Sequence, residues 1–243
     1  MLDWFFNQHA TDALSMKDIL IRIALVLIAW LLLYQLWIFI HICWWIKFNP
    51  SSSAFMQDQL EMIQQKNPDA ELKHKWVSYQ KISNHLKRAV IASEDAKFVD
   101  HEGVDWEAIQ KAYEKNLKKG KIVGGGSTIS QQLAKNLFLS SKRTPWRKVQ
   151  ELVITYMLEA VLDKRRIFEI YLNIIEWGNG VFGADAAARH YFKTSAASLS
   201  SYQAARLAVM IPNPRFYDAH KSTSYLNKRT GTIQARMRFA EIP

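Results

Sequence analysis

The sequence predicts a mainly α-helical domain that follows one membrane-spanning helix. No charged residue occurs from Ile23 to Ile46, and apolar residues recur at helical spacing through much of the second half of the chain. Alternation typical of a strand is scarce, and Lys75 to Ile82 is the best short candidate. Apolar residues make up 49% of the chain, which excludes wholesale disorder.

The uncharged run is longer than the ~20 residues that a membrane-spanning helix needs. Trp44 and Trp45 close the run beside Lys47, and indole rings favour the headgroup region of a bilayer. A buried core helix is the competing interpretation, but core helices are seldom apolar on every side over this length. A cleaved signal peptide would need a small-residue cleavage site, which does not follow the run. We therefore expect an uncleaved signal anchor.

Lys17 and Arg22 precede the run and Lys47 follows it, so the asymmetry in Lys and Arg gives only a small preference for a cytoplasmic N-terminus. The stretch Asn49 to Ser53 contains a proline and three serines, which is typical of a linker. We expect a cytoplasmic N-terminal segment at 1–18, a transmembrane anchor at 19–47, a linker at 48–54 and one soluble domain at 55–243.

The formal charge of +10 and the sequence pI of about 9.6 indicate an anionic partner. This positive charge is compatible with three anionic partners: nucleic acid, an acidic membrane surface and a phosphorylated substrate. A nucleic-acid binder would leave the apolar run unexplained, so we do not expect nucleic acid as a partner. Cys43 is the single cysteine, and no His-Glu-x-x-His pattern occurs, so the sequence predicts neither a disulfide nor a metal site.

Two capping signals mark helix starts in the second half of the chain. Thr144-Pro145 offers an N-cap hydroxyl followed by proline at the first helical position. Ser200 with Gln203 resembles a capping box ahead of another apolar stripe, which Pro212 should stop.

A carboxylate pair, Glu94 and Asp95, follows the apolar run Ala89 to Ala92. Glu94 would lie where an apolar element meets solvent, a setting in which a carboxylate can act as a base. The pair could equally be ordinary surface acids at the end of a helix.

A glycine triplet, Gly124 to Gly126, precedes the hydroxyl-rich stretch Ser127 to Ser130. Such a helix start can present backbone N–H groups and the helix dipole to an anion, but three glycines can also form a plain flexible loop. Gln132 and Lys135 are three residues apart and should share one face of the helix.

Arg147 and Lys148 lie four and three residues before Glu151, so all three can crowd one edge of a helix. Two cations beside a carboxylate favour its ionised form. An intrahelical salt bridge on a solvated face is the alternative interpretation.

In this order, the segments resemble the glycosyltransferase module of peptidoglycan synthases, glycosyltransferase family 51. Glu94-Asp95 to Gly103 is similar to the first motif of that family, and Gly126 to Asn136 to the second. Arg147 to Glu151 is similar to the third motif and Ile167 to Asn173 to the fourth, while 186–192 and 199–217 resemble the closing region. The sequence continues only briefly beyond this match, so the resemblance implies the monofunctional biosynthetic peptidoglycan transglycosylase.

The resemblance implies a lysozyme-like helical fold with a smaller, membrane-facing jaw lobe. It implies that Glu94 is the general base toward the acceptor sugar's 4-hydroxyl, and that Glu151 is a second essential carboxylate near the donor's pyrophosphate. Lys135, Arg147 and Lys148 would hold that pyrophosphate. Further substrate-binding residues implied by their places in the motifs are Gln132, Ser127, Thr128, Asp95, Phe98, His101 and Asn136.

The implied reaction adds lipid II to a lipid-linked glycan strand through a β-1,4 linkage, with inversion and release of polyprenyl (undecaprenyl) pyrophosphate. The resemblance implies no required cofactor, and it allows a divalent cation, Mg²⁺ or Mn²⁺, at the pyrophosphate. It implies a single-pass protein of the bacterial cytoplasmic (inner) membrane with its catalytic domain on the periplasmic side. The membrane is then a partner, and other cell-wall synthesis and division proteins are candidates.

Two alternatives are a lytic, lysozyme-like enzyme that cleaves glycan and a non-enzymatic membrane scaffold. A glycosidase must keep a carboxylic acid neutral to protonate a poor alkoxide leaving group, whereas pyrophosphate needs charge neutralisation instead. A carboxylate among cations, as at Glu151, suits the second case. Retention of the implied catalytic carboxylates argues against a scaffold.

Overall fold

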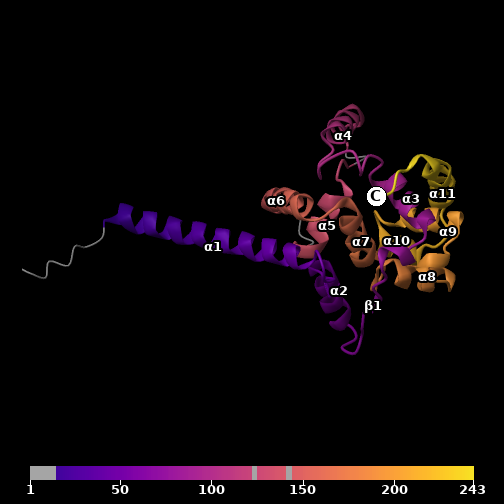
Figure 1. Ribbon diagram of the computed structural model, residues 1–243, viewed down its shortest axis with the longest axis horizontal. Coiled ribbons are helices and arrows are strands. Elements are labelled where there is room, and N and C mark those ends of the chain that lie inside the picture. The colour runs from indigo at the N-terminus through magenta and orange to yellow at the C-terminus, as the bar shows by residue number, and fades with distance from the viewer. Residues whose placement is uncertain (1–14, 122–124, 141–143) are drawn as a thin grey trace, which may run out of the picture. The chain divides into compact units, whose positions relative to one another are not determined.

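The computed structural model describes residues 15–121, 125–140 and 144–243 (Figure 1), and the chain divides into two compact units, Met1–His41 and Ile42–Pro243. Helix α1 (Met16–Trp44) makes up nearly all of the described part of the first unit, and its last three residues belong to the second. It is long and apolar enough to cross a membrane, and only 6% of its most apolar window is buried. These properties fit the expected single-pass anchor, while residues 1–14 of the expected cytoplasmic segment lie outside the described part of the chain.

The second unit is mainly helical, which confirms the expected fold class. Its α-helices are α2 (Ala54–Gln64), α3 (Asn84–Glu94), α4 (Trp106–Lys119), α5 (Ile129–Phe138), α6 (Pro145–Val161), α7 (Lys164–Ile174), α8 (Ala184–Phe192), α9 (Ser201–Met210), α10 (Pro214–Ala219) and α11 (Ser224–Arg236). Short 3₁₀ helices are η1 (Tyr79–Lys81), η2 (Ala196–Ser198) and η3 (Met237–Phe239). Strands β1 (Lys73–His74), β2 (Glu176–Gly178) and β3 (Val181–Phe182) form a small sheet in the order β1-β3-β2.

The strand expected over Lys75 to Ile82 is wrong: β1 ends at His74, and the 3₁₀ helix η1 occupies part of the segment. Side chains of α7 supply the hydrogen bonds that a neighbouring strand would otherwise give. Asn173 accepts a bond from the Val77 N–H at 2.9 Å and donates to the Val77 carbonyl at 3.0 Å. Glu169 accepts a bond from the Tyr79 N–H at 3.0 Å. These contacts satisfy the backbone without a ladder.

Both expected helix starts are confirmed. The Thr144 hydroxyl accepts a hydrogen bond from the Arg147 N–H, and Pro145 occupies the first turn of α6. Ser200 and Gln203 form the reciprocal capping box of α9, which ends at Met210, before Pro212.

The core of the second unit joins two groups of helices. Helix α5 packs against α6 and α7, while α3, α9 and α11 pack against one another (Figure 1). Phe98, on the loop after α3, is fully buried, and its ring centroid lies 5.5 Å from that of Phe168 on α7. This aromatic contact connects the two groups beneath the site described below.

The segment after α1 is bound to the body of the second unit. Arg166 on α7 donates to the carbonyls of Trp45 and Phe48 at 2.8 and 2.7 Å and to the side chain of Asn49 at 2.9 Å. The Trp45 ring also lies 5.2 Å from the ring of Phe138 on α5. The end of the expected anchor is therefore fixed to α5 and α7 through Trp45, and the start of the expected linker is fixed to α7 through Phe48 and Asn49.

Helix α4 buries no residue, unlike the helices around it. Trp106, Tyr113 and Leu117 are each 63% exposed on its surface. Its charged residues include Lys118 and Lys119 in the last turn.

We predict that Asn173→Ala lowers the free energy of unfolding by about 2–5 kcal/mol, because it removes the partners of the part-buried N–H and carbonyl groups of Val77. Urea denaturation of the detergent-solubilised full chain measures this. Asn227→Ala is the matched control, because Asn227 is exposed and its side-chain oxygen accepts an exposed hydrogen bond from Arg206. Equal costs for the two variants would contradict the proposed role of Asn173.

Candidate active site

Glu94 is the last residue of α3, and the preceding apolar turn packs into the core. The Gln132 side-chain amide donates to one carboxylate oxygen of Glu94 at 3.0 Å, and the Ser93 hydroxyl donates to the other at 3.3 Å. Burial raises the pKa of Glu94, and the neighbouring negative charge of Asp95 adds to this; the two hydrogen bonds and the charge of Arg229 oppose it. A carboxylate with a raised pKa is a stronger base than an ordinary surface acid.

Gln132 is held in place by a second buried group. The Tyr171 hydroxyl donates to the Gln132 carbonyl oxygen at 3.0 Å, so the NH₂ group of Gln132 is turned toward Glu94. Tyr171 is fully buried, and burial raises its pKa well above the ordinary value, which keeps the hydroxyl protonated as a donor. The chain Tyr171–Gln132–Glu94 therefore orients the carboxylate from the core.

Gln132 also lines a pocket of about 250 Å³, to which Glu94 does not contribute. The cations expected at the donor's pyrophosphate line this pocket. Its lining residues are Phe55, Ser127, Gln131, Gln132, Lys135, Arg147, Lys148 and Glu151. Lys135 comes from α5 and Arg147 from α6, and Gln132 and Lys135 share the expected face. We call this space the cation pocket, because three of its side chains are positive and one is negative.

Glu151 is buried at the wall of the cation pocket. Arg147 donates to one of its carboxylate oxygens at 3.0 Å, Lys148 contacts the other, and Lys148 also reaches the hydroxyl of Ser127 at 3.4 Å. This is the expected crowding of two cations and a carboxylate, but Glu151 lies in a pocket wall rather than on a solvated face. The ammonium of Lys135 lies 5.4 Å from the ring centroid of Phe55.

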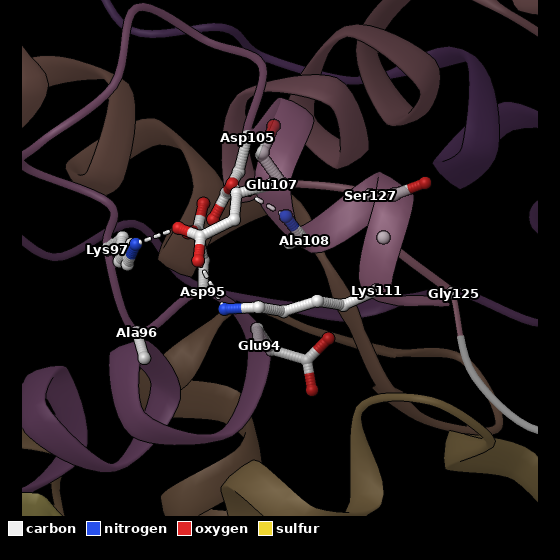
Figure 2. Close-up of a pocket in the computed structure, with 12 residues that line it drawn as sticks. Glu94, Asp95, Ala96, Lys97, Asp105, Glu107, Ala108, Lys111, Gly125 and Ser127 are labelled. Atoms are coloured by element: carbon white, nitrogen blue, oxygen red, sulfur yellow. Dashed lines mark hydrogen bonds and ion pairs between the residues drawn. The ribbon is translucent and has the colours of Figure 1, made fainter. Parts of the chain in front are cut away.

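Glu94 lines a second pocket of about 240 Å³, shown in Figure 2. We call it the Glu94 pocket; Ser127 lies on the wall of both pockets. In Figure 2 the side chains of Lys97 and Lys111 point to Glu107 at the start of α4. Hydrogen bonds from these two lysines lower the pKa of Glu107 to about 2, so Glu107 is fully ionised at neutral pH.

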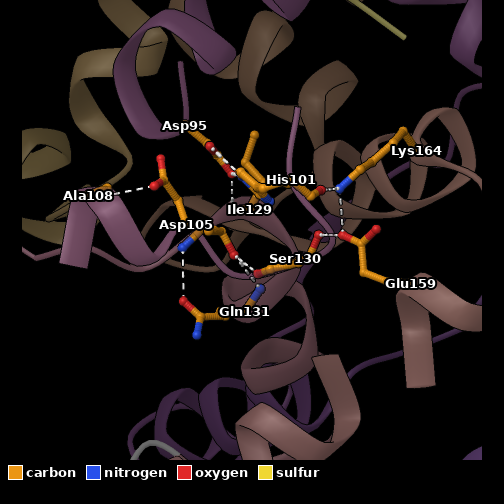
Figure 3. Close-up of polar contacts among 11 residues, drawn as sticks. Asp95, His101, Asp105, Ala108, Ile129, Ser130, Gln131, Glu159 and Lys164 are labelled. Atoms are coloured by element: carbon orange, nitrogen blue, oxygen red, sulfur yellow. Dashed lines mark hydrogen bonds and ion pairs between the residues drawn. The ribbon is translucent and has the colours of Figure 1, made fainter. Parts of the chain in front are cut away.

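Asp95 connects the end of α3 to the start of α5 (Figure 3). Its carboxylate is buried and accepts a hydrogen bond from the Ile129 N–H at 2.9 Å and one from His101 at 3.0 Å. Thr128 caps the same helix and donates to the Gly103 carbonyl at 2.5 Å, and Gln131 completes a capping box with it.

The sequence left open whether the start of α5 presents N–H groups to an anion, and two of these N–H groups already have partners within the protein. The N–H of Ile129 is taken up by Asp95 and that of Gln131 by Thr128. The anion that the helix dipole stabilises is thus the protein's own carboxylate. Gly124 lies outside the described residues. Gly126 packs so closely that an added Cβ would come within 2.8 Å of the Ile109 backbone.

The remaining residues expected in substrate binding lie behind the pockets. Phe98 is in the core, and the His101 backbone carbonyl accepts a bond from Lys164 at 2.5 Å (Figure 3). Asn136 is buried and donates to the Gln132 carbonyl at 2.7 Å. The structure gives these three residues positioning contacts, and their role in substrate binding stays a prediction.

Tyr171, which orients Gln132, and Phe55, which lines the cation pocket, were not among the expected site residues. Tyr171 is part of an apolar stripe in the sequence, and nothing in that stripe separates a core tyrosine from one that orients a site. Phe55 lies far from the other lining residues along the chain, so only the fold brings it to Lys135.

Among the described residues, no group of three His, Cys, Asp or Glu side chains is placed to hold a metal ion. The carboxylate of the cation pocket, Glu151, contacts Arg147 and Lys148 through both of its oxygens. The cation pocket thus has three side-chain cations and, among the described residues that line it, no carboxylate that lacks cation contacts. The Mg²⁺ or Mn²⁺ ion that the resemblance allows at the pyrophosphate stays a prediction.

We predict that Glu94→Gln raises the melting temperature relative to the wild type, by an amount that grows with pH. Burial raises the pKa of Glu94 in the folded state, so the folded protein retains this proton to higher pH than the unfolded chain. Wild-type stability is therefore lost as pH rises from the ordinary value of 4.5 through the raised pKa, whereas glutamine cannot ionise. Thermal unfolding between about pH 4 and about pH 8 tests this.

Glu102→Gln is the control for this experiment, because Glu102 is an exposed acid close by in the same segment. Because its side chain is exposed, this substitution should change the melting temperature less than Glu94→Gln does. A Glu94→Gln difference that shrinks with rising pH would contradict the burial of this charge.

Comparisons with known proteins place this chain in one family. A family model described as transglycosylase matches residues 59–238. The biosynthetic peptidoglycan transglycosylase of Methylobacillus flagellatus is 70% identical over 221 residues, which cover 91% of this chain and 95% of the relative. The protein of the same name from Chromobacterium violaceum is 64% identical over 94% of this chain and 100% of its own length. Matching over nearly the whole of both chains confirms the resemblance inferred from the motifs, and the chain belongs to the transglycosylase family.

Proposed function

We propose that this chain polymerises lipid II into β-1,4-linked glycan, with Glu94 as the base and the cation pocket as the site of the donor's pyrophosphate. Peptidoglycan glycosyl transfer is the activity that the family and the names of the relatives indicate. The observation that carries the assignment of roles is the position of Gln132. It lines the cation pocket and donates a hydrogen bond to Glu94, so base and cations lie on either side of one side chain.

In the proposed step, Glu94 accepts the proton of the acceptor sugar's 4-hydroxyl. The freed oxygen forms a bond to the anomeric carbon of the donor strand, and the bond from that carbon to the pyrophosphate oxygen breaks. Attack from the face opposite the leaving group inverts the anomeric centre. The Gln132 amide orients the carboxylate for this transfer without competing for the proton, because the NH₂ group that faces Glu94 is only a donor.

The leaving pyrophosphate carries the electron pair of the broken bond as negative charge. Lys135, Arg147 and Lys148 would stabilise it, and they are held in place before substrate arrives. Glu151 has a supporting part in this scheme, because it fixes two of the cations through both of its oxygens. An Arg or Lys whose position is already fixed loses less conformational entropy on binding phosphate.

A glycan-cleaving enzyme is the alternative that one observation favours, since the raised pKa of Glu94 would also suit a general acid. A cleaving enzyme has no pyrophosphate to bind, and it would leave the three cations of the cation pocket without a substrate group to neutralise. The relatives carry the word biosynthetic in their names. Polymerisation therefore explains both Glu94 and the cation pocket, whereas cleavage explains only Glu94.

The proposed substrates are confined to a membrane. Contact with that membrane would explain the apolar surfaces of α1 and α4. Helix α1 has the length and composition of a single membrane span, and α4 exposes Trp106, Tyr113 and Leu117 as the expected jaw would. We place the catalytic unit on the periplasmic side of the bacterial inner membrane, where the lipid-linked disaccharide of the family is used. Contacts with other cell-wall synthesis and division proteins stay a prediction.

We predict that Glu94→Gln abolishes polymerisation, with kcat/KM reduced by about 10²–10⁴-fold, because the amide cannot accept the proton. The measurement is glycan length and polyprenyl pyrophosphate release from lipid II in detergent. Glu102→Gln, an exposed acid in the same motif, should polymerise normally. Near-normal turnover by Glu94→Gln would remove Glu94 from the mechanism, while release of short glycans without lipid pyrophosphate would identify a cleaving enzyme.

We predict that Lys135→Ala and Arg147→Ala each lower kcat/KM roughly tenfold to a hundredfold, as the loss of a charge-assisted contact to phosphate should. Lys135→Arg should also be poorly tolerated, because a planar guanidinium and a compact ammonium fit phosphate differently. Lys118→Ala and Lys119→Ala are the controls, since both are exposed on α4. Equal losses at all four positions would mean that positive charge acts only as a diffuse membrane-binding field.

A further inference from the structure

A third hollow, of about 240 Å³, lies next to the Glu94 pocket. Its lining residues are Ala92, Ala96, Arg236, Phe239 and Ala240. Ala96 also lines the Glu94 pocket, so the two spaces meet at this residue. We call the hollow the C-terminal groove, because one wall comes from the end of α11 and from η3, which packs against α3. Figure 1 shows α3 and α11 side by side near the C-terminus.

The position of the groove relative to Glu94 follows from α3. Ala92 and Ala96 lie two residues before and two residues after Glu94. Both are small, so they leave space against the backbone where larger side chains would fill it. A molecule with one group at Glu94 could therefore extend another group over Ala96 into the groove.

The wall formed by α11 is basic. Arg229 and Arg236 are seven residues apart, two helical turns, and so lie on the same face of α11. Arg229 is close enough to Glu94 to lower its pKa, and Arg236 lines the groove. Within the described residues, neither arginine forms an ion pair or a hydrogen bond through its side chain.

The groove also presents an aromatic ring. Phe239 is 74% exposed, and the Arg238 guanidinium lies 4.6 Å from its ring centroid. An exposed aromatic side chain beside Arg236 fits a ligand that is partly apolar and carries a carboxylate.

The acceptor of the proposed reaction has a portion that is partly apolar and carries a carboxylate. Its saccharide would place the reacting hydroxyl at Glu94, and peptidoglycan precursors carry a peptide on that saccharide. Any peptide with a free C-terminus ends in a carboxylate. The pyrophosphate of the acceptor is the other candidate anion. A phosphate group has no apolar portion, so it would not pack against the apolar walls formed by Ala92, Phe239 and Ala240.

We propose that the C-terminal groove binds the peptide of the acceptor, with Arg236 facing a peptide carboxylate and Phe239 covering its apolar portion. This proposal rests on the proposed function and adds a substrate-binding site to it. The groove contributes to acceptor affinity and has no part in proton transfer or leaving-group departure.

The test compares two acceptors: the lipid-linked disaccharide with its peptide, and the same lipid-linked disaccharide with the peptide removed by an amidase. For Arg236→Ala in the full chain, we expect kcat/KM to fall about three- to tenfold with the peptide-bearing acceptor, mainly through KM. With the peptide-free acceptor, Arg236→Ala and wild type should be equal. Arg236→Lys should recover most of the loss, because it retains the charge.

Lys228→Ala is the matched control, because Lys228 is an exposed cation of α11 that does not line the groove. It should leave kcat/KM unchanged with both acceptors. The exposure of Arg236 makes a folding defect unexpected, and equal melting temperatures of variant and wild type verify this.

Equal losses for Arg236→Ala with both acceptors, or no loss with either, would overturn the peptide assignment. Equal losses would instead assign the arginine to the sugars or to the pyrophosphate. Wild-type polymerisation of the peptide-bearing acceptor supports the proposed function in either case. Absence of wild-type polymerisation would contradict the proposed function itself, so the two failures are distinguishable.

Discussion

The hydrogen bonds of the Asp95 carboxylate determine where the site is built. This buried group accepts the first N–H of α5 and a hydrogen bond from His101, and so it holds the end of α3 against the start of α5. Glu94 is the next residue back along the chain, and Gln132 lies on the first turn of α5. The distance between the base and its orienting amide is therefore set by a carboxylate that takes no part in the proposed reaction.

Most of the local structure is predictable from the sequence, because its causes are local. The helix starts at Thr144 and Ser200 need only a hydroxyl and the residues one turn ahead, and both are confirmed. The apolar run that gives α1 is likewise a property of consecutive residues. The strand expected after β1 fails for the opposite reason, since Asn173, distant in the chain, supplies its backbone with partners.

In the site, too, the features with local causes were predictable, and those that depend on contacts between distant residues were not. The motifs bring Glu94, Lys135 and Glu151 to two neighbouring pockets, as their spacing and the family resemblance led us to expect. The motifs alone do not distinguish a residue that lines a pocket from one that supports the wall, and Phe98 shows this. Tyr171 presents the converse case: in the sequence it is one more apolar position of α7, and only its hydrogen bond to Gln132 reveals its role.

The contacts of Arg166 have a mechanical consequence. A stretch with a proline and several serines ordinarily acts as a hinge, yet its beginning is bound by the guanidinium to the carbonyls of Trp45 and Phe48 and to Asn49. Three hydrogen bonds donated by one side chain therefore make Trp45 to Asn49 part of the surface of α7. The loss of this single guanidinium would release the stretch at all three points at once.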